Sequence, residues 1–358
     1  MDQYQIQVSS RDVDELRARF DEWIARRHPG ARIESFERPD GNGLSSETLL
    51  FDASWDGELH PLVARVAPSA SDVPVFETYD LGMQYRVMQL VAERSDTPVP
   101  ECLWEEDDES VIGAPFFVMR RVDGRVPRDN LPYTFEGWLL EATDAERLAM
   151  QDDTVWAVAG IHGVDLADVD TRFLGHDPDG PPALCQHLDD QRRYYDWIRG
   201  DEKIPVIEDT FAWLEANWPA DDGGQPVLSW GDSRIGNVIY DGFRPAAFLD
   251  WEMAGVAPRG VDLGWLSYMH IFFQDVAEQL GLDGLPGFLD MDDVATAYES
   301  RTGIDIGDRH FWLVYAALRY GLVMVRIEQR QIAFGEIEPT GDPETGVMHR
   351  DWLRGAIS

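Results

Sequence analysis

Apolar residues recur at two different periods along the first third of the chain. Segments with helical spacing predict two helices, at residues 13–24 and 79–94, and a serine or aspartate at positions 9–12 can cap the first. Short segments that lack the helical period predict four strands, at residues 48–55, 59–66, about 101–104 and 115–121. Asp56-Gly57 between the first two strands predicts the turn of a β-hairpin.

The remainder of the chain is mostly helical in pattern. The predicted helices lie at residues 144–163, 184–199, 206–217, 261–280, 291–302 and 309–330. One region departs from this pattern, with three short β-prone runs at residues 227–230, 237–240 and 246–251. We therefore expect an α+β protein with a small sheet-containing lobe at residues 1–121 and a larger, mostly helical lobe at 122–358. The junction is placed at the turn signal Val122-Asp123-Gly124.

The composition narrows the class of partner. The chain has 67 acidic and 30 basic side chains, a formal net charge of −37, and Lys203 is its single lysine. The electrostatic field of so negative a protein repels the phosphate backbone of a nucleic acid, so nucleic acid is not expected as a partner. It would attract a cationic substrate, although strongly acidic surfaces are more often an adaptation to solubility or salt.

The sequence also predicts a soluble cytoplasmic protein. The first residues have neither a basic start nor an apolar stretch, so we expect no secretory signal and no membrane partner. The most apolar late segment, 311–327, contains Arg319 and Arg326 and is too polar to span a bilayer. Cys102 and Cys185 lack zinc-site spacing and are expected to be reduced core thiols. The oligomeric state is not indicated.

The candidate chemistry lies in the β-prone region, at residues 230–252. Asp232 is followed five positions later by Asn237, and Asp250 comes one predicted hairpin further along. Phosphoryl transfer to a hydroxyl needs a carboxylate that accepts the hydroxyl proton and oxygen ligands that hold magnesium against nucleotide phosphates. Kinases use this spacing, with Asp232 as the base and with Asn237 and Asp250 as metal ligands. A Gly-Asp pair on its own is usually part of a turn. Here Asp232, Asn237 and Asp250 all lie at predicted strand ends within one short segment, which favours a catalytic role.

This segment resembles the aminoglycoside phosphotransferase and choline-kinase superfamily, whose usual form is His-Gly-Asp-x-x-x-x-Asn followed by Ile-Asp-Trp-Glu. The GVAPRGVDL run at 255–263 and the IHG run at 161–163 resemble further family motifs. The FFVMRRVDG run at 116–124 is similar to the strand and hinge that hold adenine. Over roughly residues 35–330, the resemblance implies a bilobal protein-kinase-like fold that binds magnesium and ATP, or another nucleoside triphosphate, between its lobes. It marks three nucleotide-binding residues: Met119, Arg120 and Val122.

The predicted small lobe also carries candidate phosphate-binding residues. The PDGNGLSSET run at 39–48 lies where the family has a Gly/Ser loop over the phosphates, which marks Gly43, Ser45 and Ser46. The alternative is a plain hairpin turn. Arg65 occupies the position of the kinase lysine in Val-Ala-x-Lys, and arginine can chelate phosphate oxygens through two donors. The alternative for Arg65 is a basic residue that points to solvent from an edge strand.

Two positions depart from the family pattern. The acidic helix residue that pairs with the kinase lysine is replaced by Gln84, so Arg65 can instead pair with Glu77 or Asp80. The family histidine before Gly-Asp is Trp230, a change that touches neither the base nor the metal ligands.

Four neighbouring residues receive lesser roles. Asp262 is expected to brace the catalytic loop by accepting backbone hydrogen bonds, and His162 is expected to be structural. Arg234 either neutralises the transferring phosphate or pairs with surface acids, and Glu252 either contacts substrate or lies near the metal.

The leading hypothesis is a small-molecule kinase that uses ATP and magnesium to phosphorylate a hydroxyl of an aminoglycoside-like compound or another metabolite. A nucleotide-binding scaffold or regulator without transferase activity is the alternative, motivated by the weakened Arg65–Gln84 pairing. A metal-dependent hydrolase would need additional ligands near 230–252, which the sequence lacks. The acceptor itself is not encoded in any motif.

Overall fold

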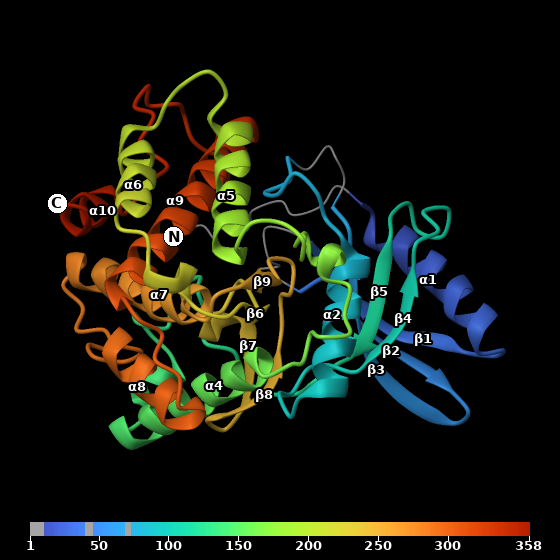
Figure 1. Cartoon of the computed structure of the whole chain (residues 1–358). Helices are drawn as coiled ribbons and strands as arrows, with labels where there is room; N and C mark the ends of the chain where they lie inside the picture. The colour runs from blue at the N-terminus through green and yellow to red at the C-terminus, as the bar shows by residue number, and fades with distance from the viewer. Residues whose placement is uncertain (1–10, 40–45, 69–72) are drawn as a thin grey trace. The chain divides into compact units, whose positions relative to one another are not determined.

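The chain divides into two compact units, which are described separately below (Figure 1). The computed structural model describes residues 11–39, 46–68 and 73–358. The first unit comprises Met1–Gln89 and Pro100–Val122, and the second comprises Leu90–Val99 and Asp123–Ser358. The expected α+β class, with a sheet-containing first part and a mostly helical second part, is confirmed.

The first unit is built on a five-stranded antiparallel sheet with the order β1-β2-β3-β5-β4. Its strands are β1 (Arg32–Glu37), β2 (Glu47–Trp55), β3 (Glu58–Val66), β4 (Cys102–Glu106) and β5 (Phe116–Arg120). Asp56 and Gly57 join β2 to β3 with φ values of 53° and 79°, the left-handed geometry of the tight turn expected there. Strand β1 had not been predicted, since its six residues show no regular apolar alternation.

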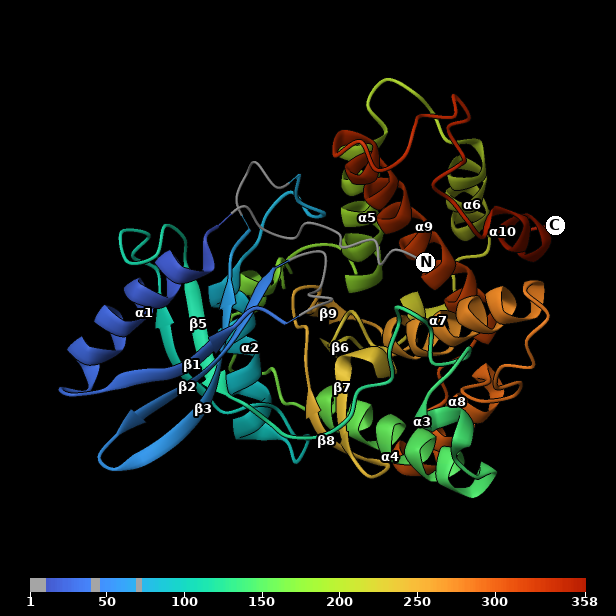
Figure 2. The same ribbon diagram turned by 180° about the vertical axis from the view of Figure 1, so that it is seen from behind.

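Successive residues of β5 explain why helices cover both faces of this sheet. Phe116 packs against Phe20 and Trp23 of α1 (Val13–Arg27), with ring centroids 5.0 and 5.1 Å away. Phe117 points to the opposite face, where the ring of Tyr85 in α2 (Leu81–Arg94) lies 6.0 Å away. Figures 1 and 2 show the sheet between the two helices. Helix α1 begins where expected, because Asp12 accepts a hydrogen bond from the Glu15 amide.

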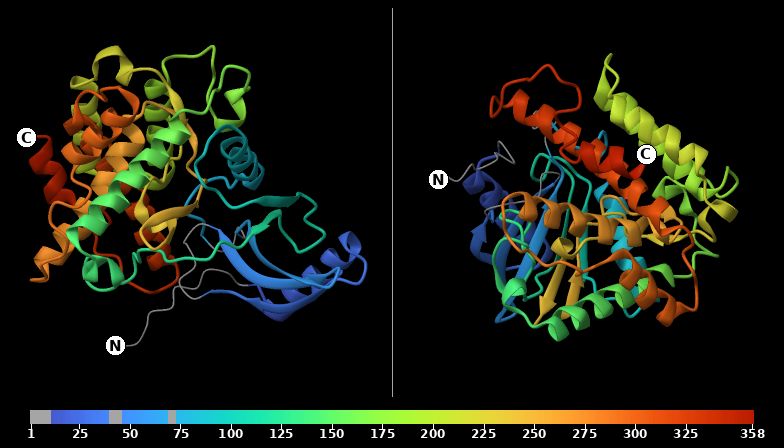
Figure 3. Two further views of the ribbon diagram at one scale, coloured as in Figure 1. Left: turned by 90° about the horizontal axis from the view of Figure 1, so that it is seen from below. Right: turned by 90° about the vertical axis from the view of Figure 1, so that its left-hand side faces the viewer.

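The second unit consists of helices around two small antiparallel sheets (Figure 3). The helices are α3 (Trp138–Glu141), α4 (Asp144–His162), α5 (Ala183–Arg199), α6 (Pro205–Ala216), α7 (Gly260–Gln279), α8 (Met291–Thr302), α9 (Arg309–Ala333) and α10 (Arg350–Ala356). One sheet pairs β6 (Val227–Ser229) with β9 (Gly255–Ala257), and the other pairs β7 (Val238–Asp241) with β8 (Arg244–Phe248). All six predicted helices form, whereas α3, α10 and β9 are too short for a periodic signal.

Helix α4 supports the hairpin of β7 and β8. A capping box of Thr143 and Glu146 fixes the start of α4. Further along the helix, the hydroxyl of Thr154 lies 2.9 Å from that of Tyr240 on β7. The backbone of Tyr240 exchanges hydrogen bonds of 2.8 and 2.9 Å with that of Arg125. The hairpin is therefore held from two sides.

The cysteines and the hydropathy of the helices bear on two of the expectations from the sequence. Cys102 and Cys185 are both free thiols. Burial raises the pKa of Cys102 to about 12, which keeps it protonated and unreactive at neutral pH. Among the helices of the described ranges, none is both long and apolar enough to cross a bilayer.

Helices α7 and α9 approach closely because α7 presents glycines to Trp312. A Cβ on Gly264 would lie 2.5 Å from the Trp312 carbonyl oxygen, and one on Gly260 would lie 2.1 Å from its ring. Alanine at either position would force the helices apart. Since α7 and α9 both contribute to the site described below, this contact links packing to function.

We predict that Gly264→Ala lowers the free energy of unfolding by about 1–3 kcal/mol, because the added methyl meets rigid backbone of α9. Gly355→Ala in α10 is the matched control, since a Cβ there meets nothing within 4 Å. That variant should be neutral or more stable by about 0.5–1 kcal/mol, the usual gain for alanine in a helix. Thermal unfolding followed by circular dichroism would measure both. Equal midpoints for the two variants would contradict this packing argument.

Candidate functional site

The three residues expected to carry the chemistry lie at the ends of short strands in the second unit. Asp232 follows β6, Asn237 precedes β7 directly, and Asp250 follows β8. Backbone hydrogen bonds bring these segments together, since the amide of Leu249 donates to the carbonyl of Asn237 at 2.9 Å. The structure therefore gathers the predicted base and the predicted metal ligands around one loop.

The carboxylate of Asp232 is buried and surrounded by donors. Its Oδ1 accepts from the indole Nε1 of Trp265 at 2.7 Å, and its Oδ2 accepts from Nδ2 of Asn237 at 2.7 Å. The Nε of Arg234 lies 3.0 and 3.1 Å from the two oxygens. These contacts fix the orientation of the carboxylate before any substrate arrives.

The pKa of Asp232 is raised to about 7. Burial is the main cause, and the negative charge of Asp250 adds to it, while the hydrogen bonds from Asn237 and Trp265 and the charge of Arg319 oppose it. A carboxylate with a pKa near neutrality can both accept and release a proton at physiological pH. Asp232 therefore has the properties of a general base.

Asn237 and Asp250 offer oxygen atoms to a cation. The amide nitrogen of Asn237 donates to the side chain and the carbonyl of Asp232, so its amide oxygen is the atom that could bind a cation. Asp250 has a left-handed backbone conformation, with φ of 57°, which aspartate tolerates better than most residues. The preceding carbonyl, that of Leu249, accepts a hydrogen bond from Nε1 of Trp230 at 2.8 Å. Trp230, which replaces the family histidine, thus secures the chain beside Asp250.

Asp262 holds the loop that carries Asp232 through hydrogen bonds. Its fully buried carboxylate accepts hydrogen bonds from the amides of Trp230 and Gly231, the hydroxyl of Ser229 and the imidazole of His162, all at 2.8–2.9 Å. Burial alone would raise the pKa of Asp262, but these contacts hold it below its ordinary value. The expectation that Asp262 braces the loop through backbone hydrogen bonds is confirmed.

Glycine is required immediately before the candidate base. Gly231 has φ of 89°, and a Cβ at this position would lie 1.9 Å from the carbonyl oxygen of Met253. The loop therefore passes the 250–253 segment at a distance that no other residue permits.

Arg234 pairs with acids, but one of them is the buried Asp232 and not a surface acid as expected. It bridges Asp232 to Asp129, whose carboxylate forms an ion pair with Nη1 of Arg234. Asp250 and Glu252 also act electrostatically on the Arg234 guanidinium, so both acids lie near it. No motif indicated Asp129, which belongs to a segment more than one hundred positions earlier.

In the first unit, several predicted nucleotide-binding residues occupy neighbouring strands. Arg65 on β3 donates to the hydroxyl of Thr48 at 2.9 Å. Because Val63 pairs with Met119, Arg65 lies on the same sheet face as Met119. Ser46 is buried, whereas Gly43 and Ser45 lie outside the described residues.

The end of β5 and helix α2 hold the remaining residues of interest in the first unit. Arg120 pairs with Glu101 at 2.5 Å, and Val122 is half-buried at the end of this unit. Gln84 is buried in α2, and its amide nitrogen has no hydrogen-bond partner among the described residues.

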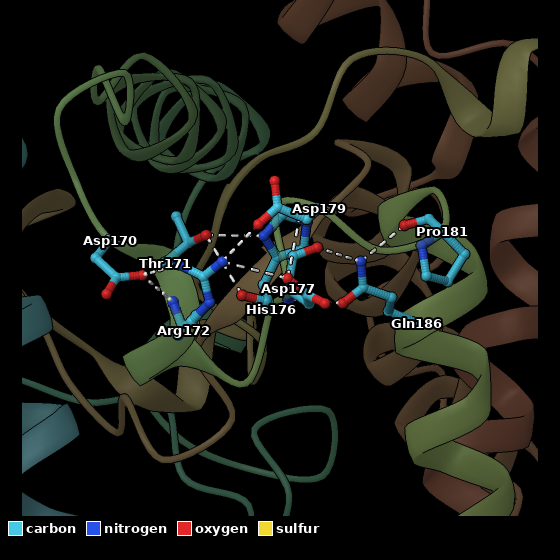
Figure 4. A network of polar contacts seen from close by, with 8 residues as sticks. All are labelled: Asp170, Thr171, Arg172, His176, Asp177, Asp179, Pro181 and Gln186. Carbon is cyan, nitrogen blue, oxygen red and sulfur yellow. Dashed lines mark hydrogen bonds and ion pairs between the residues drawn. The ribbon is translucent and has the colours of Figure 1, made fainter.

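A second group of acids lies in the connection from α4 to α5 (Figure 4). Arg172 lies 2.7 Å from Asp179, 3.2 Å from Asp170 and 3.6 Å from Asp177. The amide of Gln186 on α5 donates to the carbonyl of Asp177 at 2.9 Å. A single arginine therefore offsets part of the charge of these three acids, and its contacts brace the connection.

Trp265 is the neighbour of Asp232 that sequence reasoning missed. It follows Asp262 by three positions on α7, so one helical turn carries both the brace of the loop and a donor to the candidate base. An aromatic residue one turn after the Asp-Leu pair is the signal that could have indicated it.

Proteins of known sequence and structure resemble this chain over most of its length. The model of the phosphotransferase enzyme family matches residues 38–294. Acyl-CoA dehydrogenase family member 11 of Gallus gallus is 32% identical over 213 residues, which are 59% of this chain and 25% of that protein. The probable acyl-CoA dehydrogenase IBR3 of Arabidopsis thaliana is 23% identical over 336 residues, 88% of this chain and 39% of that protein. The chain thus spans well under half the length of these relatives.

Solved structures share the fold. A candidate aminoglycoside phosphotransferase from Ralstonia eutropha JMP134 has a TM-score of 0.68 with 24% identity, covering 95% of this chain and 96% of that one. A macrolide 2'-phosphotransferase from Brachybacterium faecium has a TM-score of 0.57 with 18% identity, covering 95% and 97%. The resemblance inferred from the 230–263 motifs is confirmed, and the chain belongs to the phosphotransferase enzyme family.

Proposed function

We propose that the protein transfers the terminal phosphoryl group of ATP to a hydroxyl of a small molecule, with magnesium as cofactor. The observation that carries this proposal is the hydrogen bond from Asn237 to Asp232 within the Asp-x-x-x-x-Asn loop, beside Asp250. It supports the proposal because a carboxylate with a pKa near 7 then lies beside two side chains that can offer oxygen atoms to a cation. Membership in the phosphotransferase enzyme family supports the same reaction class.

Asp232 acts as the base in this proposal. Its carboxylate accepts the proton of the attacking hydroxyl, the hydroxyl oxygen bonds to the γ-phosphorus, and the bond from that phosphorus to the bridging oxygen breaks. The products are a phosphorylated acceptor and a nucleoside diphosphate. Trp265, Asn237 and Arg234 hold the carboxylate in place during the transfer.

The donor set around the loop fits a magnesium ion held jointly with a nucleotide. Asn237 and Asp250 supply hard oxygen donors, the type that magnesium prefers. When bound, the ion neutralises charge on the phosphates. No group of three or more histidine, cysteine, aspartate or glutamate side chains suited to a metal occurs in the described part of the chain. The protein ligands alone are therefore few, as expected where phosphates and water complete the coordination.

The first unit is proposed as the nucleotide clamp, with the second unit as the catalytic and acceptor-binding part. Arg65 would chelate phosphate oxygens, and the strand end at Met119, Arg120 and Val122 would hold the base of the nucleotide. A relative in fold, the aminoglycoside phosphotransferase APH(4)-Ia, has been crystallised with ADP and hygromycin B, at a TM-score of 0.56 and 15% identity. That complex supports nucleotide binding by the shared fold.

Two acceptor classes follow from different observations. The net charge of −37 and the fold relatives that act on aminoglycosides favour a cationic, sugar-like acceptor. The names of the curated relatives favour a hydroxyl-bearing acyl thioester instead. A panel containing both classes, assayed for nucleoside diphosphate release, would distinguish them.

A nucleotide-binding protein without transferase activity is the competing function. The buried Gln84 amide favours it, because this side chain cannot supply the negative charge that kinases pair with their basic residue. Calorimetry with ATP, combined with the acceptor panel, separates the two: binding without phosphate transfer to any acceptor would support the scaffold.

Asp232→Asn is expected to lower kcat by about 10²–10⁴-fold, since the amide cannot accept the hydroxyl proton. ATP affinity should change little, because the side chain remains isosteric. Asp241→Asn, an exposed aspartate at the end of β7, is the matched control and should retain activity. Turnover of Asp232→Asn equal to that of the control would refute the assignment of the base.

Asp250→Asn is expected to abolish magnesium-dependent turnover and to raise the magnesium concentration for half-maximal ATP binding by more than about tenfold. Asp221→Asn controls for backbone geometry, because Asp221 also has a left-handed φ, of 51°, and is exposed. Magnesium titrations by calorimetry in the presence of ATP would measure the effect. An unchanged titration in Asp250→Asn would remove Asp250 from the metal site.

The raised pKa of Asp232 also predicts a pH-dependent stability in metal-free buffer. Between about pH 4 and pH 7 the unfolded chain releases this proton while the folded protein keeps it, so charging Asp232 destabilises the wild type as pH rises. Asp232→Asn has no such penalty. Its melting temperature relative to wild type should therefore increase by about 2–6 °C from pH 5 to pH 7.5. A difference that stays constant with pH would show that Asp232 titrates normally.

A further inference from the structure

Arg319 is a buried cation in the middle of α9. Its side chain is 1% exposed, and its Nη2 donates to the carbonyl of Gly231 at 2.9 Å. The Nε and Nη1 atoms have no hydrogen-bond partner among the described residues. Burying a guanidinium for one hydrogen bond is costly, and an apolar side chain would serve helix packing better. A role beyond packing is therefore indicated.

The guanidinium contacts two groups that position the candidate base. Gly231, whose carbonyl it binds, immediately precedes Asp232 in the chain. The guanidinium carbon also lies 4.4 Å from the ring centroid of Trp265, whose Nε1 donates to Asp232. Arg319 thus contacts both the backbone that leads into Asp232 and the side chain that orients its carboxylate.

Arg319 supplies its positive charge from the α9 side of the candidate site, whereas Arg234 pairs with Asp232 from its own loop. A titratable base close to Arg319 is His187, whose Nδ1 lies 2.5 Å from the hydroxyl of Tyr315. Burial and the positive charge of Arg319 lower the pKa of His187 to about 3, so the imidazole is neutral. Arg319 therefore offsets the buried carboxylates of Asp232 and Asp262 from the α9 side, with its charge acting on both.

We propose that Arg319 is a positioning residue for phosphoryl transfer, which fixes Asp232 through the Gly231 carbonyl and the Trp265 indole. This inference rests on the proposed role of Asp232 as base. It requires the planar, forked guanidinium, because a lysine ammonium can neither stack flat on the indole nor hold the same geometry.

The test compares Arg319→Lys with Arg326→Lys. Arg326 lies seven positions further along α9 and also stacks on a tryptophan, with its guanidinium carbon 4.4 Å from the Trp197 ring centroid. Both variants keep their charge. In Arg319→Lys, kcat should fall by about 10- to 100-fold while the KM for MgATP stays within about twofold, because misplacing a base slows chemistry without weakening binding. The control should retain both parameters.

A second readout requires no acceptor. In protein labelled with ¹⁵N-tryptophan, the indole signal of Trp265 is identified by its loss in Trp265→Phe. We expect Arg319→Lys to shift this signal and to speed its hydrogen exchange by about tenfold or more, whereas Arg326→Lys leaves it unchanged. An unmoved Trp265 signal, or a kcat equal to that of the control, would overturn the proposal. Failure of the base itself is recognised separately, since Asp232→Asn would then retain full turnover.

Discussion

The buried carboxylate of Asp262 is the interaction on which the candidate site depends. It sits at the start of α7 and accepts hydrogen bonds from the backbone amides of Trp230 and Gly231, both of which are buried. Removing it would leave these amides buried and unpaired, and the loop that carries Asp232 would lose its fixed path. The close approach of α7 to α9 serves the same end, because α7 also supplies Trp265. The packing of α7 against α9 and the orientation of the candidate base therefore depend on the same few residues.

The loop also concentrates opposed charges in a region with little water. Asp232 and Asp250 repel each other, and their repulsion contributes to the raised pKa of Asp232. Arg234 and Arg319 offset part of this repulsion from two sides. A divalent cation bound near Asp250 would offset the remaining repulsion between the two carboxylates and lower the pKa of Asp232. The candidate base would then be ionised when the cation is bound. This coupling gives a physical reason why activity and magnesium binding should be linked.

Local spacing explains why some of this could be predicted from the sequence and some could not. Asp232 and Asn237 belong to one loop, and Asp250 follows a single hairpin, so their proximity is a consequence of short-range geometry. The hydrogen bonds to Trp265 and Arg319 join residues 33 and 88 positions apart, and no periodicity encodes such contacts. Strand β9 has three residues and contains glycine and alanine, which are uncommon in strands, whereas the equally short β6 lies in a β-prone run. Long, periodic helices and the brace by Asp262 were therefore predicted, whereas the contacts of Trp265 and Arg319 emerged only from the structure.

The central claim is that this site moves a phosphoryl group to a hydroxyl. Phosphorus-31 NMR of the protein with MgATP and the acceptor panel tests it most directly, because it distinguishes a phosphate ester from inorganic phosphate. The account predicts a new phosphomonoester resonance with one acceptor class, formed as the γ-phosphate signal declines, and its absence when Asp232→Asn replaces the wild type. Persistence of the ATP signals with every acceptor, or conversion to inorganic phosphate alone, would contradict it.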